Sequence, residues 1–211
     1  NMPTGAPATE ELYAELVAFG KRHGILICND NTYSFILNDS PLSILAQPGA
    51  KECCLELNSL SKAHNMAGWR IGMVAADAEV ISQILKVKSQ MDSGMFKPLQ
   101  LAAVKALEQG SGWFTELNDE YRRRRVLAGA IFDMLGVEYD HSSAGMFLWG
   151  KVPKIVQAGQ GISIGQVLSD RILYEAGVFI TPGFIFGKNG EDYIRISLCA
   201  KEEKLAEALE R

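Results

Sequence analysis

The stretch Ser59-Leu60-Ser61-Lys62-Ala63-His64-Asn65-Met66-Ala67-Gly68-Trp69-Arg70-Ile71-Gly72 separates two short apolar runs with hydroxyls, an amine and a guanidinium. The run before it, residues 53–58, has the length and partial alternation of a strand, and the run after it, 71–76, is short and apolar as well. We expect the chain to leave a sheet at Ser59 and return to it at Ile71. Because ligands of open α/β sheets bind at strand ends, we expect the chemistry in this stretch.

The composition is that of an ordinary globular protein. Of the 211 residues, 47% are apolar and 22% are charged, which argues against disordered and fibrous classes. The 21 basic and 25 acidic residues give a net charge of −4. Such a chain has no global positive field to attract nucleic acid or anionic lipid, so we expect neither partner.

The apolar runs and the cysteines favour the cytoplasm. No apolar run approaches the ~20 residues of a membrane span, and the N-terminal residues do not resemble a signal peptide. The four cysteines lack a CxxC spacing, and only three histidines could join them as metal ligands. We therefore expect buried thiols in strands and no metal site. The first residue is not Met, which suggests that the sequence starts within a longer protein.

The first half of the chain reads as alternating helices and strands. A helix is expected from about Thr9, its N-cap, to His23, with Gly24 as its stop and an apolar face of Leu12, Leu16 and Phe19. The apolar strand that follows, 25–28, ends in polar residues that include Asp30 and Tyr33. A long connection is expected over 37–51, and two helices over 78–91 and 98–110.

The second half has a different pattern of predicted helices and strands. One apolar stripe predicts a long helix over 113–135, which carries Arg122-Arg123-Arg124-Arg125. Acidic residues four positions earlier favour a solvated, salt-bridged helix over a nucleic-acid contact. Three strands and two helices should follow, at 146–152, 178–181, 193–199, 164–176 and 201–209. We predict two domains, 1–110 and 111–211, the second a smaller α+β domain that includes the long helix.

The polar groups at the strand ends form a chemically coherent set. Pyridoxal phosphate needs a lysine for its Schiff base, a carboxylate beside its pyridine nitrogen and donors for its phosphate. The sequence offers candidates for each need, namely Lys62, Asp30, Tyr33, Ser59, Ser61, Arg70 and Arg195.

Spacing and order within this set resemble a known family. The segment Ser59-Leu60-Ser61-Lys62 is followed eight residues later by Arg70 in Gly68-Trp69-Arg70-Ile71-Gly72. Three further matches occur in order: Pro3-Thr4-Gly5-Ala6, Asp30-x-x-Tyr33, and Pro182-Gly183-x-x-Phe186-Gly187 leading to Tyr193-Ile194-Arg195-Ile196-Ser197. The chain is similar over its whole length to the class I/II aminotransferases of PLP fold type I.

The resemblance implies an α/β fold and a role for each site residue. The fold would be part of a large domain with a mostly parallel sheet and flanking helices, followed by the small α+β domain. Lys62 would hold pyridoxal 5′-phosphate as an internal aldimine, Asp30 would pair with the pyridine nitrogen, and Tyr33 would hydrogen-bond the ring oxygen. Ser59 and Arg70 would hold the phosphate. Arg195 would fork onto the substrate α-carboxylate, as Arg can and Lys cannot.

The chain departs from the family in two ways. Met2 stands where the family has an Asn that contacts the ring oxygen, and Asn1 is one position too early, so neither is among the expected ligands. Family members are also about twice as long, so we expect this chain to be a C-terminal half that is inactive alone. The resemblance implies a homodimer that acts on an amino acid and a 2-oxo acid. The lack of a second candidate arginine favours a neutral amino donor such as alanine.

Three alternatives stay open at this point. A PLP β-lyase or related synthase shares the motif set and would release pyruvate and ammonia without a 2-oxo acceptor. A transcription regulator that retains the fold would carry a DNA-binding domain upstream. A cofactor-free α/β domain would show no cofactor absorbance and no loss of binding in Lys62→Ala.

Overall fold

The computed structural model describes residues 2–156, 159 and 161–211. The chain divides into two compact units, one formed by Ala8–Thr115 and the other by the N-terminal segment up to Pro7 together with Glu116–Arg211. Each unit is described by itself. The division that we predict, at residue 110, stays a prediction.

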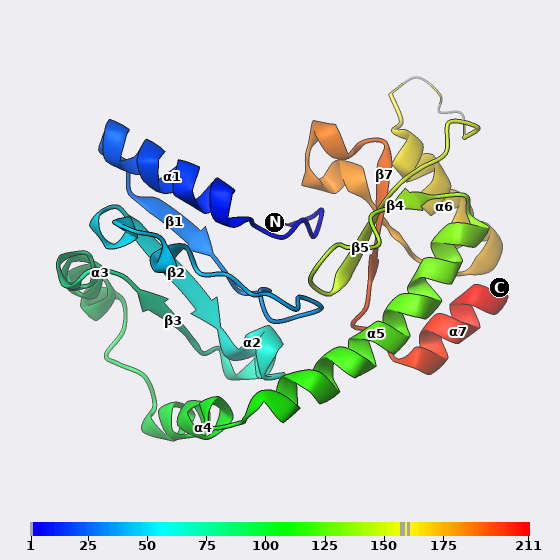
Figure 1. The fold of residues 1–211 in the computed structure, drawn as a ribbon. Helices are drawn as coiled ribbons and strands as arrows, with labels where there is room; N and C mark the ends of the chain where they lie inside the picture. The colour runs from blue at the N-terminus through cyan, green and yellow to red at the C-terminus, as the bar shows by residue number, and fades with distance from the viewer. Residues whose placement is uncertain (1, 157–158, 160) are drawn as a thin grey trace. The chain divides into compact units, whose positions relative to one another are not determined.

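The first unit is built on a three-stranded sheet. Its strands are β1 (Ile27–Asp30), β2 (Cys54–Ser59) and β3 (Gly72–Ala75), in the order β1-β2-β3 (Figure 1). β1 and β2 are parallel, with Ile27 opposite Cys54, whereas β3 is antiparallel to β2. β1 begins two residues later than the sequence predicts, and Ile25 and Leu26 are exposed. An apolar run alone does not set the register, which here starts at Ile27.

Helix α1 (Glu10–His23) packs on this sheet with a different face from the one expected. Its ends are as predicted: the Thr9 hydroxyl accepts a hydrogen bond from the Leu12 N–H at 3.2 Å, and Gly24 adopts a left-handed φ of 61°. The buried residues, however, are Tyr13, Val17 and Gly20, while Leu12 and Phe19 of the predicted face are 38% and 46% exposed.

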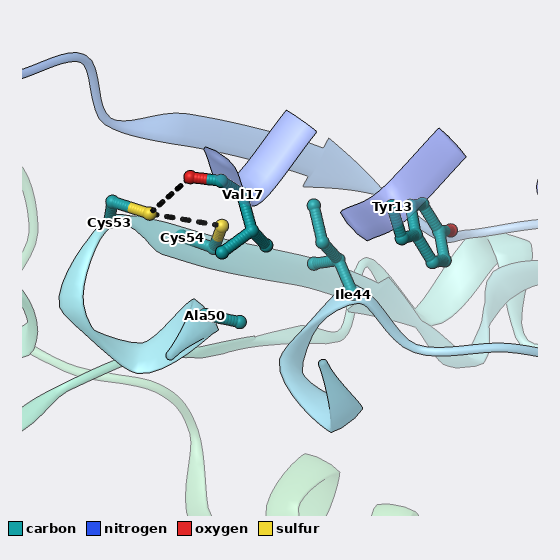
Figure 2. Packing of buried hydrophobic residues seen from close by; sticks show 6 residues of the cluster. All are labelled: Tyr13, Val17, Ile44, Ala50, Cys53 and Cys54. Carbon is teal, nitrogen blue, oxygen red and sulfur yellow. Dashed lines mark hydrogen bonds between the residues drawn. The ribbon is translucent and has the colours of Figure 1, made fainter. Parts of the chain in front are cut away.

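The reason lies in how closely the helix approaches the sheet. A Cβ at Gly20 would lie 3.0 Å from the Ile25 carbonyl oxygen and 3.2 Å from the Cys53 sulfur. The helix therefore turns its smallest residue toward the chain beneath it. Figure 2 shows the resulting cluster, whose members are Tyr13, Val17, Ile44, Ala50, Cys53 and Cys54.

The four cysteines are free, and only two are buried as expected. Cys28 and Cys199 are exposed. The buried Cys53 thiol donates to the Val17 carbonyl at 3.6 Å and lies 3.8 Å from the Cys54 sulfur (Figure 2). Burial and this neighbouring thiol raise the pKa of Cys54 to about 11.

The remaining elements of the first unit are mostly helical. The predicted connection contains two short 3₁₀ helices, η1 (Ile44–Ala46) and η2 (Ala50–Glu52). After β3 come α3 (Ala78–Met91), capped by the Asp77 side chain, and α4 (Lys97–Leu107). Both lie where helices are predicted, α4 ending three residues early. A second small cluster joins Leu60, Met66, Ile71 and Ala103.

The second unit holds an antiparallel four-stranded sheet. Its strands are β4 (Glu138–Tyr139), β5 (Phe147–Lys151), β6 (Thr181–Pro182) and β7 (Tyr193–Ser197), in the order β4-β5-β7-β6. The predicted strand at 178–181 is wrong for its first three residues, because pairing with β7 begins only at Thr181. Helices α6 (Ile164–Ala176) and α7 (Glu202–Glu210) lie where predicted.

The long helix α5 (Ser111–Met134) begins in the first unit and continues into the second. Of the seven residues that form the predicted apolar stripe, Phe114 and Leu135 are partly exposed and the other five are buried, namely Leu117, Tyr121, Ala128, Ile131 and Phe132. The arginine run forms ion pairs, and Arg124 pairs with Glu120 at the expected spacing of four. Asp119 pairs with Arg122 rather than with Arg123, which instead pairs with the distant Glu202. Within the described part of the chain, no helix combines the length and apolarity needed to cross a bilayer.

Candidate active site

Two neighbouring strand ends carry most of the predicted site residues. β1 ends at Asp30, which lies opposite Leu57 of the parallel strand β2. Two residues beyond Leu57, β2 ends at Ser59 and runs directly into the one-turn helix α2 (Leu60–Ala63), which contains Lys62. The structure thus places Asp30 and the start of the Ser59–Lys62 segment at the same edge of the sheet, as the parallel pairing requires.

The Lys62 amine lies beside Tyr33. Its Nζ atom is 5.8 Å from the centre of the Tyr33 ring, within the ~6 Å range of cation–π attraction. Tyr33 follows β1 and Lys62 follows β2, so parallel pairing brings together two residues 29 positions apart in the chain. This contact supports the expectation that the two strand ends form one site.

Ser59 joins the end of β2 to the loop that carries Arg70. Its hydroxyl accepts a hydrogen bond from the Ser61 N–H at 3.1 Å and donates to the Ile71 carbonyl at 3.4 Å. The Leu60 N–H donates to the same carbonyl at 3.3 Å. Because Ile71 follows Arg70 directly, these bonds hold the arginine backbone next to Ser59.

Arg70 has an unusual backbone conformation. Its φ is 53°, in the left-handed region that few non-glycine residues adopt and that often marks functional sites. The Arg70 side chain is exposed, and its Nη1 donates to the Ala67 carbonyl at 2.9 Å. That bond uses one of the five N–H donors of a guanidinium, so the group retains donors with which to hold an anion.

The Asp30 carboxylate is also exposed. Its Oδ1 accepts hydrogen bonds from the Thr32 N–H and from the Thr32 hydroxyl, as in a turn after a strand. The carboxylate therefore keeps a fixed direction while its surface stays accessible.

Arg195 belongs to the second unit. It lies on β7 between Trp149 of β5 and Thr181 of β6. The guanidinium carbon is 4.1 Å from the ring centre of Phe147 and 4.3 Å from that of Phe186. Two aromatic faces therefore flank the group that we expect to bind a carboxylate.

The chain matches one protein family along its whole length. The sequence profile described as "Aminotransferase class I and II" covers residues 1–211. The chain belongs to the class I and II aminotransferase family. Members of this family use pyridoxal phosphate, as the motifs imply.

Relatives and solved structures agree with this assignment. The chain is 38% identical to an LL-diaminopimelate aminotransferase of Maridesulfovibrio salexigens and 40% identical to one of Natranaerobius thermophilus, in each case over 100% of the chain and 53% of the relative. It is 32% identical to apo BacF of Bacillus subtilis, with a TM-score of 0.88, and the match covers 100% of this chain and 52% of that one. It is 31% identical to an aminotransferase of Staphylococcus aureus, with a TM-score of 0.86, and the match covers 99% of this chain and 54% of that one.

These comparisons also bear on size and fold class. The chain spans about half the length of the curated relatives that it matches. Its α/β fold is that of PLP fold type I, as expected. Asn1 lies outside the described residues.

The first unit contains the donor set that the family's cofactor requires. An amine, a carboxylate, a hydroxyl and a guanidinium lie on the ends of β1 and β2 and on the loop before β3. The Lys62 amine contacts the Tyr33 ring, and the bond of Ser59 to the Ile71 carbonyl holds the Arg70 backbone beside Ser59. The residues therefore fit pyridoxal phosphate. The described residues contain no cluster of three or more groups suited to hold a metal ion.

Two residues near this site, His64 and Glu56, had no assigned role in the sequence prediction. His64, two positions after Lys62, lies parallel to the Trp113 ring at 6.4 Å and meets the Phe114 ring edge-on at 5.5 Å. Burial among these rings lowers the pKa of His64. Trp113 in turn donates its indole N–H to the Ala63 carbonyl at 2.7 Å, which ties α5 to the lysine helix.

The second omitted residue is Glu56. It is only 4% exposed although it carries a carboxylate. The available signal was an acid within the apolar run 53–58, flanked in the sequence by leucines.

Proposed function

We propose that the protein is a pyridoxal-phosphate-dependent aminotransferase that moves an amino group from an amino acid to a 2-oxo acid. The observation that carries the proposal is the meeting of Lys62 and Tyr33, 5.8 Å apart, on strand ends that also carry Asp30 and Ser59. Family membership along the whole chain supports it.

Each site residue has a distinct task in this proposal. The cofactor supplies an electron-accepting ring when bound. Lys62 would hold the cofactor at its aldehyde carbon and carry a proton at the substrate α-carbon, Asp30 would keep the ring nitrogen protonated, and Tyr33 would donate to the ring oxygen. Ser59 and Arg70 donate to the phosphate.

The substrate requirement follows from Arg195. A guanidinium presents two parallel N–H groups to a carboxylate, so the amino donor needs an unmodified α-carboxylate. The curated relatives are named for LL-diaminopimelate, whereas the sequence favours a neutral donor such as alanine. A panel that contains both compounds discriminates between them. We further propose that the protein works as a homodimer, as the family resemblance implies, and that it acts in the cytoplasm.

The test is a half-reaction in the protein as its gene encodes it. The protein is loaded with pyridoxal phosphate and mixed with a single amino acid in the absence of a 2-oxo acid. An aminotransferase converts one equivalent of cofactor, seen as a change of absorbance, and releases one equivalent of 2-oxo acid. A 2-oxo acid added afterwards restores the spectrum. Continuous release of pyruvate and ammonia without an acceptor would instead establish a β-lyase.

The matched controls are two lysine variants. Lys62→Ala should lower the rate by on the order of 10³-fold or more, because it removes both the attachment point and the proton carrier. Lys51→Ala changes an exposed lysine of η2 in the same unit and should leave the rate unchanged.

A further inference from the structure

Glu56 is a buried carboxylate that accepts hydrogen bonds from five neutral donors. Asn58 Nδ2 and Asn31 Nδ2 donate to its Oε1 at 2.9 and 3.2 Å. Asn29 Nδ2, the Ser43 hydroxyl and the Ile44 N–H donate to its Oε2 at 3.0, 3.0 and 3.1 Å. A carboxylate that is 4% exposed is costly unless such bonds compensate its lost hydration. These donors therefore have to stay in place around it.

Three of the donors are immediate neighbours of predicted site residues. Asn29 and Asn31 lie on either side of Asp30, and Asn58 directly precedes Ser59. Side chains alternate along a strand, so Asn29 and Asn31 point to the Glu56 side of the sheet and Asp30 to the other. The Asn31 N–H continues the ladder by donating to the Leu57 carbonyl at 2.9 Å. The Glu56 carboxylate thus accepts hydrogen bonds from both sequence neighbours of Asp30.

The other contacts anchor the carboxylate to the rest of the unit. Ser43 and Ile44 attach the connection after β1 to β2. Asn29 Nδ2 also lies 3.2 Å from the Tyr13 hydroxyl oxygen, which links the network to α1. Tyr13 and Ile44 form the end of the buried cluster opposite Cys53 in Figure 2. The network therefore adjoins a buried cluster of the first unit.

We propose that Glu56 is a positioning residue for the cofactor site, which fixes Asp30 relative to Ser59 and Lys62 through the side chains of Asn29, Asn31 and Asn58. The inference rests on the proposed function. Parallel pairing alone leaves the β1 end attached to β2 through the backbone, while the Glu56 network adds a second, side-chain layer at the same edge. Its effect on the cofactor is indirect.

The test compares cofactor binding with stability in the protein as its gene encodes it. Glu56→Gln keeps the size of the side chain but turns an acceptor into a donor that faces other donors. We measure the Kd of pyridoxal phosphate by absorbance titration of the apoprotein, the pH midpoint of the bound cofactor's absorbance, and the unfolding midpoint of the apoprotein. Glu56→Gln should raise the Kd about tenfold, the equivalent of about one buried hydrogen bond, and shift the absorbance midpoint.

The controls separate positioning from stability. Glu52→Gln changes an exposed carboxylate of the same unit that pairs with Lys21 at 2.9 Å, and should alter none of the three readings. Asn31→Ala and Asn58→Ala each remove one donor, leave the charge with four others, and keep the test valid if Glu56→Gln does not fold. Each should raise the Kd by a few fold. Glu56→Asp should recover part of the loss, since it restores an acceptor.

Two negative results would overturn different proposals. An unchanged Kd and absorbance midpoint in a folded Glu56→Gln variant, or in both Asn variants, would show that the network serves stability alone and would overturn the inference. Failure of the unaltered protein to bind pyridoxal phosphate would overturn the proposed function instead. The two failures are therefore distinguishable.

Discussion

The two units hold their central charged groups in different ways. In the first, the Glu56 carboxylate is fixed by five directional hydrogen bonds from neutral groups. In the second, the Arg195 guanidinium lies between the faces of Phe147 and Phe186. Ring faces restrain the plane of a guanidinium but use none of its N–H donors. The first arrangement fixes a buried charge through directional hydrogen bonds, whereas the second restrains the plane of a charged group through ring faces.

Arg195→Lys should break the second arrangement most severely. An ammonium keeps the charge but lacks the planar fork and stacks poorly between rings. With charge-assisted bonds worth about 1.5–3 kcal/mol, we expect the KM for the amino acid to rise about tenfold to a hundredfold. Steady-state kinetics measure the change, and Arg171→Lys, on an exposed arginine paired with Glu175, is the control. An unchanged KM would separate Arg195 from substrate binding.

Phe186→Leu should have a smaller effect, because it removes one of the two rings and leaves the fork. A partly exposed cation–π contact is worth roughly 0.5–1 kcal/mol, so the KM should rise about twofold to fivefold while kcat changes little. Phe184→Leu is a close control, since Phe184 lies in the same turn, η4 (Gly183–Phe186), and is 40% exposed against 39% for Phe186. Equal effects of both variants would show that the turn, not the ring on Arg195, matters.

Substitution of His64 should have the smallest effect, which is on the pH dependence of stability. It tests whether aromatic surroundings that bury a histidine disfavour its cation. Burial lowers its pKa in the folded protein, so below a pH of about 6.5 the unfolded chain binds a proton that the folded chain does not. The His64 contribution to stability is thus present above that pH and is lost as the pH falls through the folded-state pKa. Urea unfolding at several pH values should show a shallower acid-side decline in His64→Gln.

An exposed side chain that does not titrate provides the control for this measurement. Gln90→Ala, in α3, should leave the pH dependence of unfolding as it is in the unaltered protein. An identical acid-side decline in His64→Gln would mean that the rings around His64 do not disfavour its cation.

Local signals in the sequence predicted the helices well. The N-caps Thr9 and Asp77 and the stop at Gly24 fix helix ends through contacts within a few residues, so α1 and α3 lie where expected. The strand-end rule also predicted that Lys62 and Tyr33 belong together. Their chemical roles, and those of the other site residues, stay predictions.

Features that depend on distant partners were not predictable in the same way. The buried face of α1 is set by the close approach of Gly20 to Cys53, and the start of β1 by its register with Cys54. Glu56 gave only a weak signal because its partners Asn29 and Asn31 lie 27 and 25 residues away in the chain. Parallel strands create such distant contacts by their geometry.

The most direct test of the account is to identify the residue to which the cofactor is bonded. The protein as its gene encodes it is loaded with pyridoxal phosphate, treated with borohydride to make the bond permanent, digested and analysed by mass spectrometry. The account predicts a phosphopyridoxyl group on Lys62 within the peptide that contains Ser59 and Ser61. A label on any other lysine, or a protein that takes up no cofactor, would contradict it.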